Sequence, residues 1–280
     1  MQLKNNYIRL TLDPVGAELK GLYNIETGKE VMWNGDATWW SGISPLLFPF
    51  IGTSKDHKYT YEDKTYDMRP HGFIKDREFK VAELTEDAVR FVYTSTESDY
   101  EVYPFKFEIS VSYTIEWSIV KVDWNVKNLD TKEMLYTIGA HPSFICEDGD
   151  VLSFETKGDK TNFYSLEGPL IKDKELMEPK RLELNADAFP IDTWIYDGVK
   201  SATLFNVNKG SSVKVTFDDF TYVGVWSPVK NGQMAPFVCI EPWEGLPDYT
   251  TATGNLKDKI TATKLGPGNE KAYTYSIEIA

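Results

Sequence analysis

A long, strict alternation of apolar and polar side chains over residues 104–128 is the feature that most limits what this chain can fold into. Apolar residues occupy every second position of 105–115 and again of 120–126, with a break at 116–118. Successive side chains of a β-strand point to opposite faces of the sheet. The pattern therefore predicts two long strands, each with one buried and one wetter face.

Shorter alternating segments extend this pattern along the chain, at residues 7–12, 80–84, 89–93, 212–217 and 272–279. Turn residues such as Asn-Gly at 231–232 suit tight connections between strands. Residues 37–42 suggest at most one turn of helix, and residues 172–188 are mixed and charged rather than amphipathic. No linker or internal repeat divides the chain. These features predict an all-β sandwich of antiparallel sheets with few short helices, as a single domain over residues 1–280.

The net charge and the number of cysteines limit which binding partners and which cellular compartment are expected. A formal net charge of −13 would repel a phosphate backbone, so nucleic acid is not expected as a partner. The two cysteines, Cys146 and Cys239, have apolar neighbours, which favours buried free thiols in a reducing compartment. The start of the chain lacks the apolar run of a signal peptide, and no stretch approaches the roughly 18 apolar residues that span a bilayer. We therefore expect a cytoplasmic protein without a membrane partner.

The three histidines lie in different contexts. His57 lies in a charged stretch and is expected in a solvated loop. His71 follows Arg-Pro and precedes Gly-Phe, and His141 follows Gly-Ala and precedes Pro-Ser. Both lie where a strand ends and the chain must turn, and such loops often display functional groups. Each is either a functional residue or a residue that caps or packs the turn.

Glu241 ends an apolar strand, residues 237–240, and is followed directly by Pro242 and Trp243. Burial at the end of an apolar run raises the pKa of a carboxyl, which suits a general base near neutral pH. The alternative is a glutamate that accepts hydrogen bonds from backbone amides at a bend. The sequence leaves both interpretations open.

The sequence offers little evidence for a metal site, a catalytic nucleophile or a nucleotide-binding loop. His71, His141 and Glu241 are separated by 70 and then 100 positions, so no local pair has the spacing of a zinc site, and no metal is expected. No Gly-x-Ser-x-Gly motif is present, and no glycine-rich phosphate loop appears.

Three of these segments together resemble the aldose 1-epimerase superfamily, most closely its LacX-like branch. They are His-Gly-Phe at 71–73, Gly-Ala-His-Pro-Ser-Phe at 139–144 and Cys-Ile-Glu-Pro-Trp at 239–243. Ser-Pro-Leu-Leu-Phe-Pro-Phe-Ile-Gly at 44–52 and Tyr-Val-Gly-Val-Trp-Ser at 222–227 are also similar, so the resemblance spans almost the whole chain.

The resemblance implies a galactose mutarotase-like supersandwich that holds a sugar in an open cleft. It implies interconversion of the α and β anomers of a free aldose, without cofactor or metal. By position, Glu241 matches the general base that takes the proton of the anomeric hydroxyl, and His141 the general acid that protonates the ring oxygen. His71 matches the second histidine, which stabilises charge near that oxygen.

Other residues matched by position are expected to bind the sugar. Asp192 matches the carboxylate that grips sugar hydroxyls, with Asp197 as a competitor. Trp243, Phe73 and Phe144 either pack against the C–H face of the sugar or belong to the core.

The basic residues depart from the family pattern. Galactose mutarotases carry Asn-Arg where this chain has residues 51–55, and Lys55 stands as the replacement for that arginine. Lys75, with Arg77 nearby, occupies a position where relatives often have arginine. Together with Arg69, these residues either bind the phosphate of a hexose 6-phosphate or are plain surface charges.

The expected function is therefore aldose 1-epimerase activity on a free aldohexose, galactose or glucose being the natural guesses. A hexose-6-phosphate 1-epimerase and a non-catalytic carbohydrate-binding protein are the alternatives. The resemblance leaves open whether the protein forms a homodimer.

Overall fold

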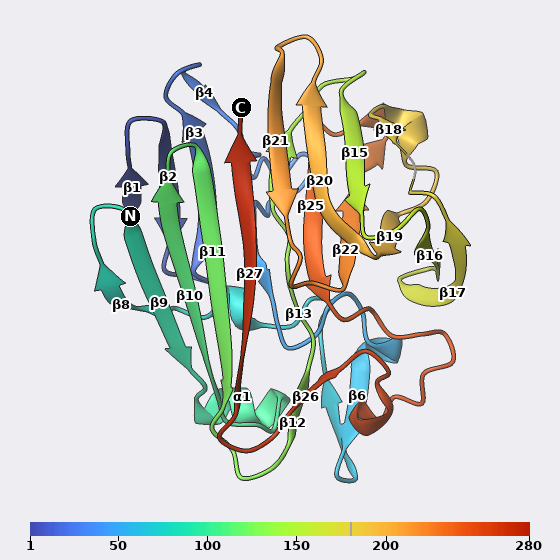
Figure 1. Cartoon of the computed structure of the whole chain (residues 1–280). Helices are drawn as coiled ribbons and strands as arrows, with labels where there is room; N and C mark the ends of the chain where they lie inside the picture. The colour runs from blue at the N-terminus through green and yellow to red at the C-terminus, as the bar shows by residue number, and fades with distance from the viewer. Residues whose placement is uncertain (180) are drawn as a thin grey trace.

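The computed structural model describes residues 1–179 and 181–280, and most of their strands lie in antiparallel sheets. Among the described residues, the sheet with the most strands has nine, which lie side by side in Figure 1. Their order is β18 (Leu182–Glu183), β15 (Val151–Thr156), β20 (Val199–Asn206), β21 (Ser211–Thr216), β27 (Glu270–Ile279), β11 (Ile119–Asn128), β10 (Phe107–Glu116), β9 (Ala88–Thr94) and β8 (Lys80–Leu84).

Eight of the described strands form a second sheet, which carries the site described below. Its order is β17 (Leu170–Met177), β16 (Thr161–Glu167), β19 (Thr193–Asp197), β22 (Tyr222–Trp226), β25 (Phe237–Glu244), β13 (Ile138–Ala140) and β5 (Leu46–Leu47), with β14 (Ser143–Ile145) also paired with β25. A smaller sheet contains β1 (Gln2–Lys4), β2 (Ile8–Asp13), β3 (Glu18–Asn24) and β4 (Lys29–Glu30).

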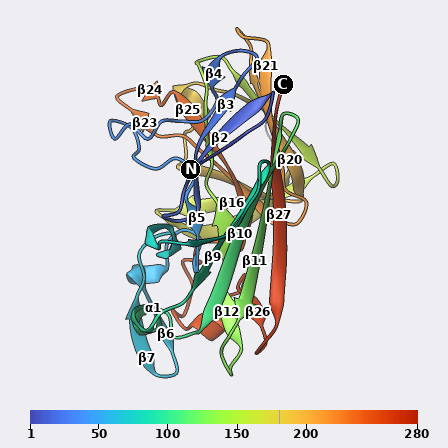
Figure 2. The ribbon, with the colours of Figure 1, turned by 90° about the vertical axis from the view of Figure 1, so that its left-hand side faces the viewer.

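Short elements complete the fold. The two-stranded pairs are β6 (Lys58–Tyr61) with β7 (Lys64–Asp67), β12 (Met134–Tyr136) with β26 (Thr263–Leu265), and β23 (Val229–Lys230) with β24 (Gln233–Met234). The helical segments are α1 (Glu97–Val102) and the 3₁₀ turns η1 (Lys55–His57), η2 (Ile74–Asp76), η3 (Ala186–Ala188) and η4 (Leu256–Asp258). His57 is exposed in η1, as its charged surroundings predict. In the side view of Figure 2, β5 and the β6–β7 hairpin lie on one side of β10, β11 and β27.

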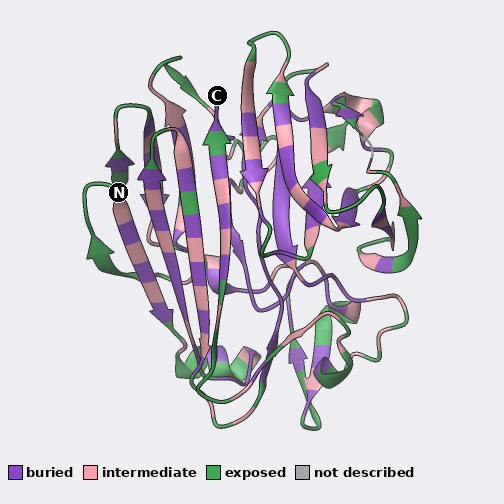
Figure 3. Cartoon of the chain, viewed as in Figure 1, coloured by how far each residue is buried: buried purple, intermediate pink, exposed green. Residues whose placement is uncertain are grey.

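The alternating stretch at 104–128 forms the predicted pair of strands. β10 and β11 pair from Phe107 with Asn128 to Glu116 with Ile119, so only two residues make the turn. Trp117 in this turn has φ 54°, the left-handed conformation that such tight connections require. Figure 3 shows the alternation of buried and wetter residues along β10, β11 and β27. The expected all-β sandwich of antiparallel sheets with few short helices is confirmed.

Three segments differ from the expectation. β8 forms at residues 80–84, but all of its residues are exposed, because it is the outermost strand of its sheet. The charged region 172–188 contributes part of β17, another edge strand that is exposed along most of its length. Residues 37–39 form a turn rather than a helix, held by the Trp39 and Trp40 N–H groups on the Asp36 carbonyl.

Alternation within β25 separates the main core from the site. Val238 and Ile240 pack in the large core shared by both long sheets. Cys239 and Trp243 point the other way, each into a small satellite cluster on the opposite face of the sheet. Glu241 shares that face because side chains two residues apart on a strand point in the same direction.

Both cysteines are buried and free, as predicted. No helix in residues 1–179 and 181–280 has the length and apolar character needed to cross a membrane.

Candidate active site

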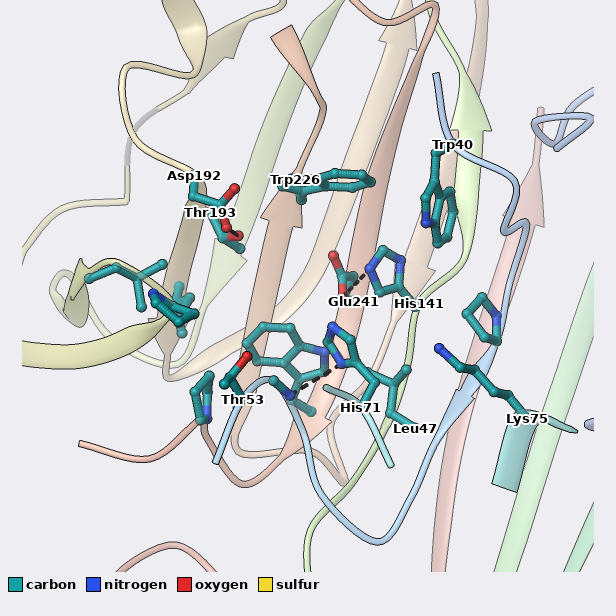
Figure 4. A pocket seen from close by; sticks show the side chains of 17 residues that line it. Trp40, Leu47, Thr53, His71, Lys75, His141, Asp192, Thr193, Trp226 and Glu241 are labelled. Atoms are coloured by element: carbon teal, nitrogen blue, oxygen red, sulfur yellow. Dashed lines mark hydrogen bonds and ion pairs between the residues drawn. The ribbon is translucent and has the colours of Figure 1, made fainter. Parts of the chain in front are cut away.

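A cavity of about 320 Å³ opens on the face of the eight-stranded sheet that points away from the main core (Figure 4). Segments far apart in the sequence line it: the loops before β5 and around η2, the end of β13, and strands β19, β22 and β25. The structure brings six of the nine predicted site residues to its wall, namely Glu241, His141, His71, Asp192, Lys75 and Trp243.

Glu241 is the most deeply buried carboxylate of this cavity, with 1% of its surface exposed. It lies in the middle of β25, opposite Gly224 of β22. Burial raises its pKa far above the usual value, the Asp192 carboxylate adds to the rise, and the Trp243 side chain opposes it. The apolar run before Glu241 in the sequence predicts this rise in pKa.

His141 follows β13 directly and faces Glu241. Its Nε2 atom lies 3.2 Å from Oε2 of Glu241. The indole of Trp40 stacks on the imidazole at 4.6 Å between ring centroids, and Trp226 meets it edge-on at 5.7 Å. Burial, together with the neighbouring His71, holds the pKa of His141 well below its ordinary value, so the resting imidazole is neutral at neutral pH.

His71 is held by Gly52 through two hydrogen bonds. The His71 N–H donates to the Gly52 carbonyl at 2.8 Å, and the Gly52 N–H donates to His71 Nδ1 at 3.2 Å. Because Nδ1 accepts a hydrogen bond, the neutral ring carries its proton on Nε2. Burial and the Lys75 charge lower the pKa of His71 to about 4. His71 is thus a neutral N–H donor, with its ring edge-on to His141 at 5.5 Å.

Trp243 lines the cavity, and its indole lies against two glycines. A Cβ at Gly139 of β13 would lie 2.6 Å from Cδ1 of the indole, and one at Gly224 of β22 would lie 2.8 Å from Cζ2. Real Cβ atoms do not approach so closely. Glycine is therefore required on both neighbouring strands for the indole to lie across them.

Asp192, rather than Asp197, reaches the cavity. Asp192 lies just before β19, and its Oδ2 accepts a hydrogen bond from the Thr193 hydroxyl at 3.1 Å. Asp197 is already bound, because it accepts hydrogen bonds from Tyr164 at 2.9 Å and from both the backbone and the side chain of Asn162.

Lys75, in η2, lines the cavity, and it has no ion-pair partner among the described residues. The arginines near it are paired: Arg69 with Asp76, and Arg77 Nε with Asp99 Oδ1 at 2.7 Å. Burial, and secondarily the Arg69 charge, lowers the pKa of Lys75. The ammonium therefore lies in a partly dry position where an anion would stabilise it.

Three predicted sugar contacts lie outside the cavity, and Arg77, bound to Asp99, is one of them. Lys55 is a second: its N–H donates to Asp248 at 3.0 Å, and its ammonium donates to a main-chain carbonyl. Phe144 is the third, fully buried opposite Val238 on the core side of β25. Phe73, left open between sugar and core, is a core residue.

Sequence reasoning missed two aromatic walls, Trp40 and Trp226. Trp226 was within reach, because it lies two residues after Gly224 on β22 and inside the recognised segment 222–227. Trp40 lies in an irregular loop, where no periodicity shows which way a side chain points.

His141, Cys239 and Glu241 also form a group that could hold a metal ion. Their ligand atoms all lie within 4.8 Å of one another, and all three residues are buried. Separation along the sequence had argued against a ligand set, but strand pairing brings β13 beside β25 and so gathers these side chains.

Comparisons with known proteins identify the family of the chain. The family model described as aldose 1-epimerase matches residues 1–276. The plasmid-encoded protein LacX of Lactococcus lactis subsp. lactis is 30% identical over 306 residues, which cover 100% of this chain and 99% of LacX.

Two crystal structures share the galactose mutarotase-like fold that the resemblance implies. One is a galactose mutarotase related enzyme from Lactobacillus acidophilus, with a TM-score of 0.95, 27% identity, and 100% and 97% of the two chains covered. The other is a galactose mutarotase-like protein from Lactobacillus casei, with a TM-score of 0.92, 28% identity, and 100% and 99% covered. The chain belongs to the aldose 1-epimerase family, in its LacX-like branch.

Proposed function

We propose that the protein interconverts the α and β anomers of an aldohexose by opening and reclosing the sugar ring. One observation carries this proposal: a buried carboxyl, Glu241, lies 3.2 Å from the neutral imidazole of His141 at the wall of an open cavity. Family membership supports an isomerase of this kind. Ring opening removes one proton and delivers another on nearby atoms, and these two groups do both.

The Glu241–His141 pair is proposed to hold one proton at rest. The raised pKa of Glu241 and the lowered pKa of His141 place this proton on the carboxyl. Its transfer across the 3.2 Å contact yields a carboxylate and an imidazolium, which hydrogen bonds from the sugar stabilise.

In the reaction, Glu241 then takes the proton of the anomeric hydroxyl while His141 gives its proton to the ring oxygen, and the C1–O5 bond breaks. The neutral Nε2–H of His71 donates a hydrogen bond near that oxygen. The open-chain aldehyde rotates about C1–C2 and recloses on its other face by the reverse transfers. The pair gains one proton and loses one, so no cofactor is consumed.

Lys75 favours a phosphorylated sugar as the second candidate substrate. It lines the cavity without an ion-pair partner among the described residues, whereas Arg69 and Arg77 are already paired. A hexose 6-phosphate would supply the missing anion. The enzyme would then be a hexose-6-phosphate 1-epimerase with the same acid–base pair.

Polarimetry tests both versions. Wild type should relax the optical rotation of freshly dissolved α-galactose, α-glucose or their 6-phosphates faster than buffer does. If the phosphate binds Lys75, Lys75→Met should lower kcat/KM for the 6-phosphate roughly 10- to 150-fold more than for the free sugar, because one charge-assisted contact of about 1.5–3 kcal/mol is lost. If no sugar relaxes faster than in buffer while one still binds, the protein is a carbohydrate-binding protein and the enzyme proposal fails.

The rate should not fall between pH 7 and pH 6, as it would if a histidine with an ordinary pKa had to be neutral for activity. The pKa of His71 is lowered to about 4, and that of His141 is also lowered, so both rings stay neutral well below the usual imidazole value of about 6.5. A pH profile of kcat/KM should therefore stay level from pH 7 down past 6 and fall only as the pH approaches the lowered pKa values. A half-loss between pH 6 and 7 would contradict this assignment.

A further inference from the structure

We infer that His141, Cys239 and Glu241 form an inhibitory binding site for a zinc-like divalent cation in the wall of the cavity. The ligand atoms of the three side chains lie within 4.8 Å of one another. The site lies outside the proposed function, which needs no metal and gives Cys239 no role.

The fold directs the three ligands toward one point. Cys239 and Glu241 are two residues apart on β25, so they project from the same face of the sheet. His141 follows the neighbouring strand β13, and its Nε2 already lies 3.2 Å from Oε2 of Glu241. Zinc bonds of about 2.0–2.3 Å place tetrahedral ligand atoms roughly 3.3–3.8 Å apart. Closing from 4.8 Å requires side-chain shifts of about 1 Å.

A second observation points to a ligand at this place. Apart from its contact with His141, the buried Oε2 of Glu241 has no hydrogen-bond partner among the described residues, and Nδ1 of His141 has none either. A buried polar atom with unused hydrogen-bonding capacity is destabilising. A cation bound to Oε2 removes that cost for the carboxylate.

The donor set selects the class of cation. A thiolate, an imidazole and a carboxylate suit zinc and similar borderline-to-soft ions, whereas magnesium and calcium prefer oxygen ligands alone. Two of the three ligands are anionic when bound, so they neutralise a divalent charge. His141 and Glu241 line the cavity, which leaves room for a water molecule as the fourth ligand.

Binding stops proton transfer in the pair. The cation takes the Nε2 lone pair of His141 and an oxygen of Glu241, while the Cys239 thiol and the Glu241 carboxyl release their protons to solvent. No electron changes hands. The two groups that exchange protons with the sugar are then both occupied, so the bound ion inhibits turnover.

Cobalt spectroscopy tests the site without any sugar. Co²⁺ added to the purified protein should produce a thiolate-to-cobalt charge-transfer absorption at one equivalent, and Zn²⁺ should abolish it by competition. The matched variants are Cys239→Ser and Cys146→Ser, which replace the two cysteines of the sequence one at a time. We expect the band in wild type and in Cys146→Ser, and its loss in Cys239→Ser.

A band that survives in Cys239→Ser, or that Mg²⁺ displaces as well as Zn²⁺ does, would overturn the inference. Circular dichroism of each variant identifies one that fails to fold, and Cys239→Ala, which keeps the position apolar, then replaces it.

A second measurement links the site to activity. Zn²⁺ should slow anomer interconversion by wild type, and a chelator should restore the rate. Cys239→Ala, compared with its own metal-free rate, should need at least about tenfold more Zn²⁺ for the same inhibition, because even the loss of a residue that only supports a metal ligand typically weakens binding about 10–100-fold. Equal sensitivity of the two proteins would place the inhibitory ion elsewhere. If the protein turns over no sugar, the cobalt band still decides whether the site exists.

Discussion

Glu241→Gln is expected to slow anomer interconversion about 10²–10⁴-fold, the usual contribution of a positioned general acid or base. Glutamine keeps the shape of the side chain but cannot take the proton of the anomeric hydroxyl. The fall should appear in kcat, with binding of the sugar largely kept, because the lost interaction belongs to the transition state. Polarimetry for the rate and calorimetry for sugar binding separate the two quantities.

A matched control lies on the same strand. Glu244→Gln makes the same substitution three residues on, at a side chain that binds Lys271 and Thr221 rather than the cavity. Its rate should remain within about twofold of wild type, because Glu244 does not line the cavity. The fold should also tolerate the change, since a partly exposed ion pair contributes about 1 kcal/mol or less to stability. Equal losses in the two variants would mean that Glu241 has no special role in the chemistry.

Stability gives Glu241→Gln a second readout. Because folding raises the pKa of Glu241, the carboxylate destabilises the folded state progressively as the pH rises above its unfolded pKa. Glutamine has no such penalty. The variant should therefore unfold at a higher temperature than wild type at pH 8, and the gain should vanish near pH 4. A variant that is slower and yet no less stable cannot owe its slowness to unfolding.

Gly72→Ala should destabilise the fold by about 3 kcal/mol or more, lowering Tm by roughly 6–12 °C. Gly72 has φ 69°, and a Cβ there would lie 2.1 Å from the Phe48 carbonyl oxygen. Both the left-handed conformation and a clash with main chain oppose the methyl group. His71 precedes it and is itself left-handed at φ 64°, so relief of the clash should also displace the imidazole and lower kcat in the folded fraction.

Gly210→Ala isolates the conformational part of this cost. Gly210 has a similar φ of 62°, but a Cβ there would meet nothing within 4 Å. We expect a loss of about 1–2 kcal/mol and an unchanged rate. Thermal unfolding of the two variants side by side measures the difference. Equal losses would show that the contact with Phe48 is relieved at no cost.

The alternation of apolar and polar residues was sufficient to predict the interior strands of the sheets, but not the strands at the sheet edges. Alternation at 104–128 reports a strand with one buried face, so β10 and β11 were predictable. An edge strand needs no such pattern, because its exposure depends on what lies beside it. β8 was therefore expected to be half-buried and is exposed, and β17 was not recognised within a charged stretch.

The site likewise has a part that could be predicted from the sequence and a part that could not. His71, His141 and Glu241 belong to recognisable segments, and the structure brings all three to one cavity. Their grouping with Cys239 depends on which strands pair. Phe144 was placed near the sugar because it follows His141 closely, but alternation along β14 turns its side chain into the core. Closeness along the chain does not fix the face of a sheet.

The glycines at 139 and 224 determine how close the Trp243 indole lies to the sheet. Since the indole of residue 243 rests directly on the backbone of two adjoining strands, a single methyl group at either place would lift it toward the opening. If the cavity binds a sugar as proposed, the ring size that it accepts should depend on these two glycines, which do not themselves line the cavity. Substitutions there should then change selectivity among sugars without altering Glu241 or His141.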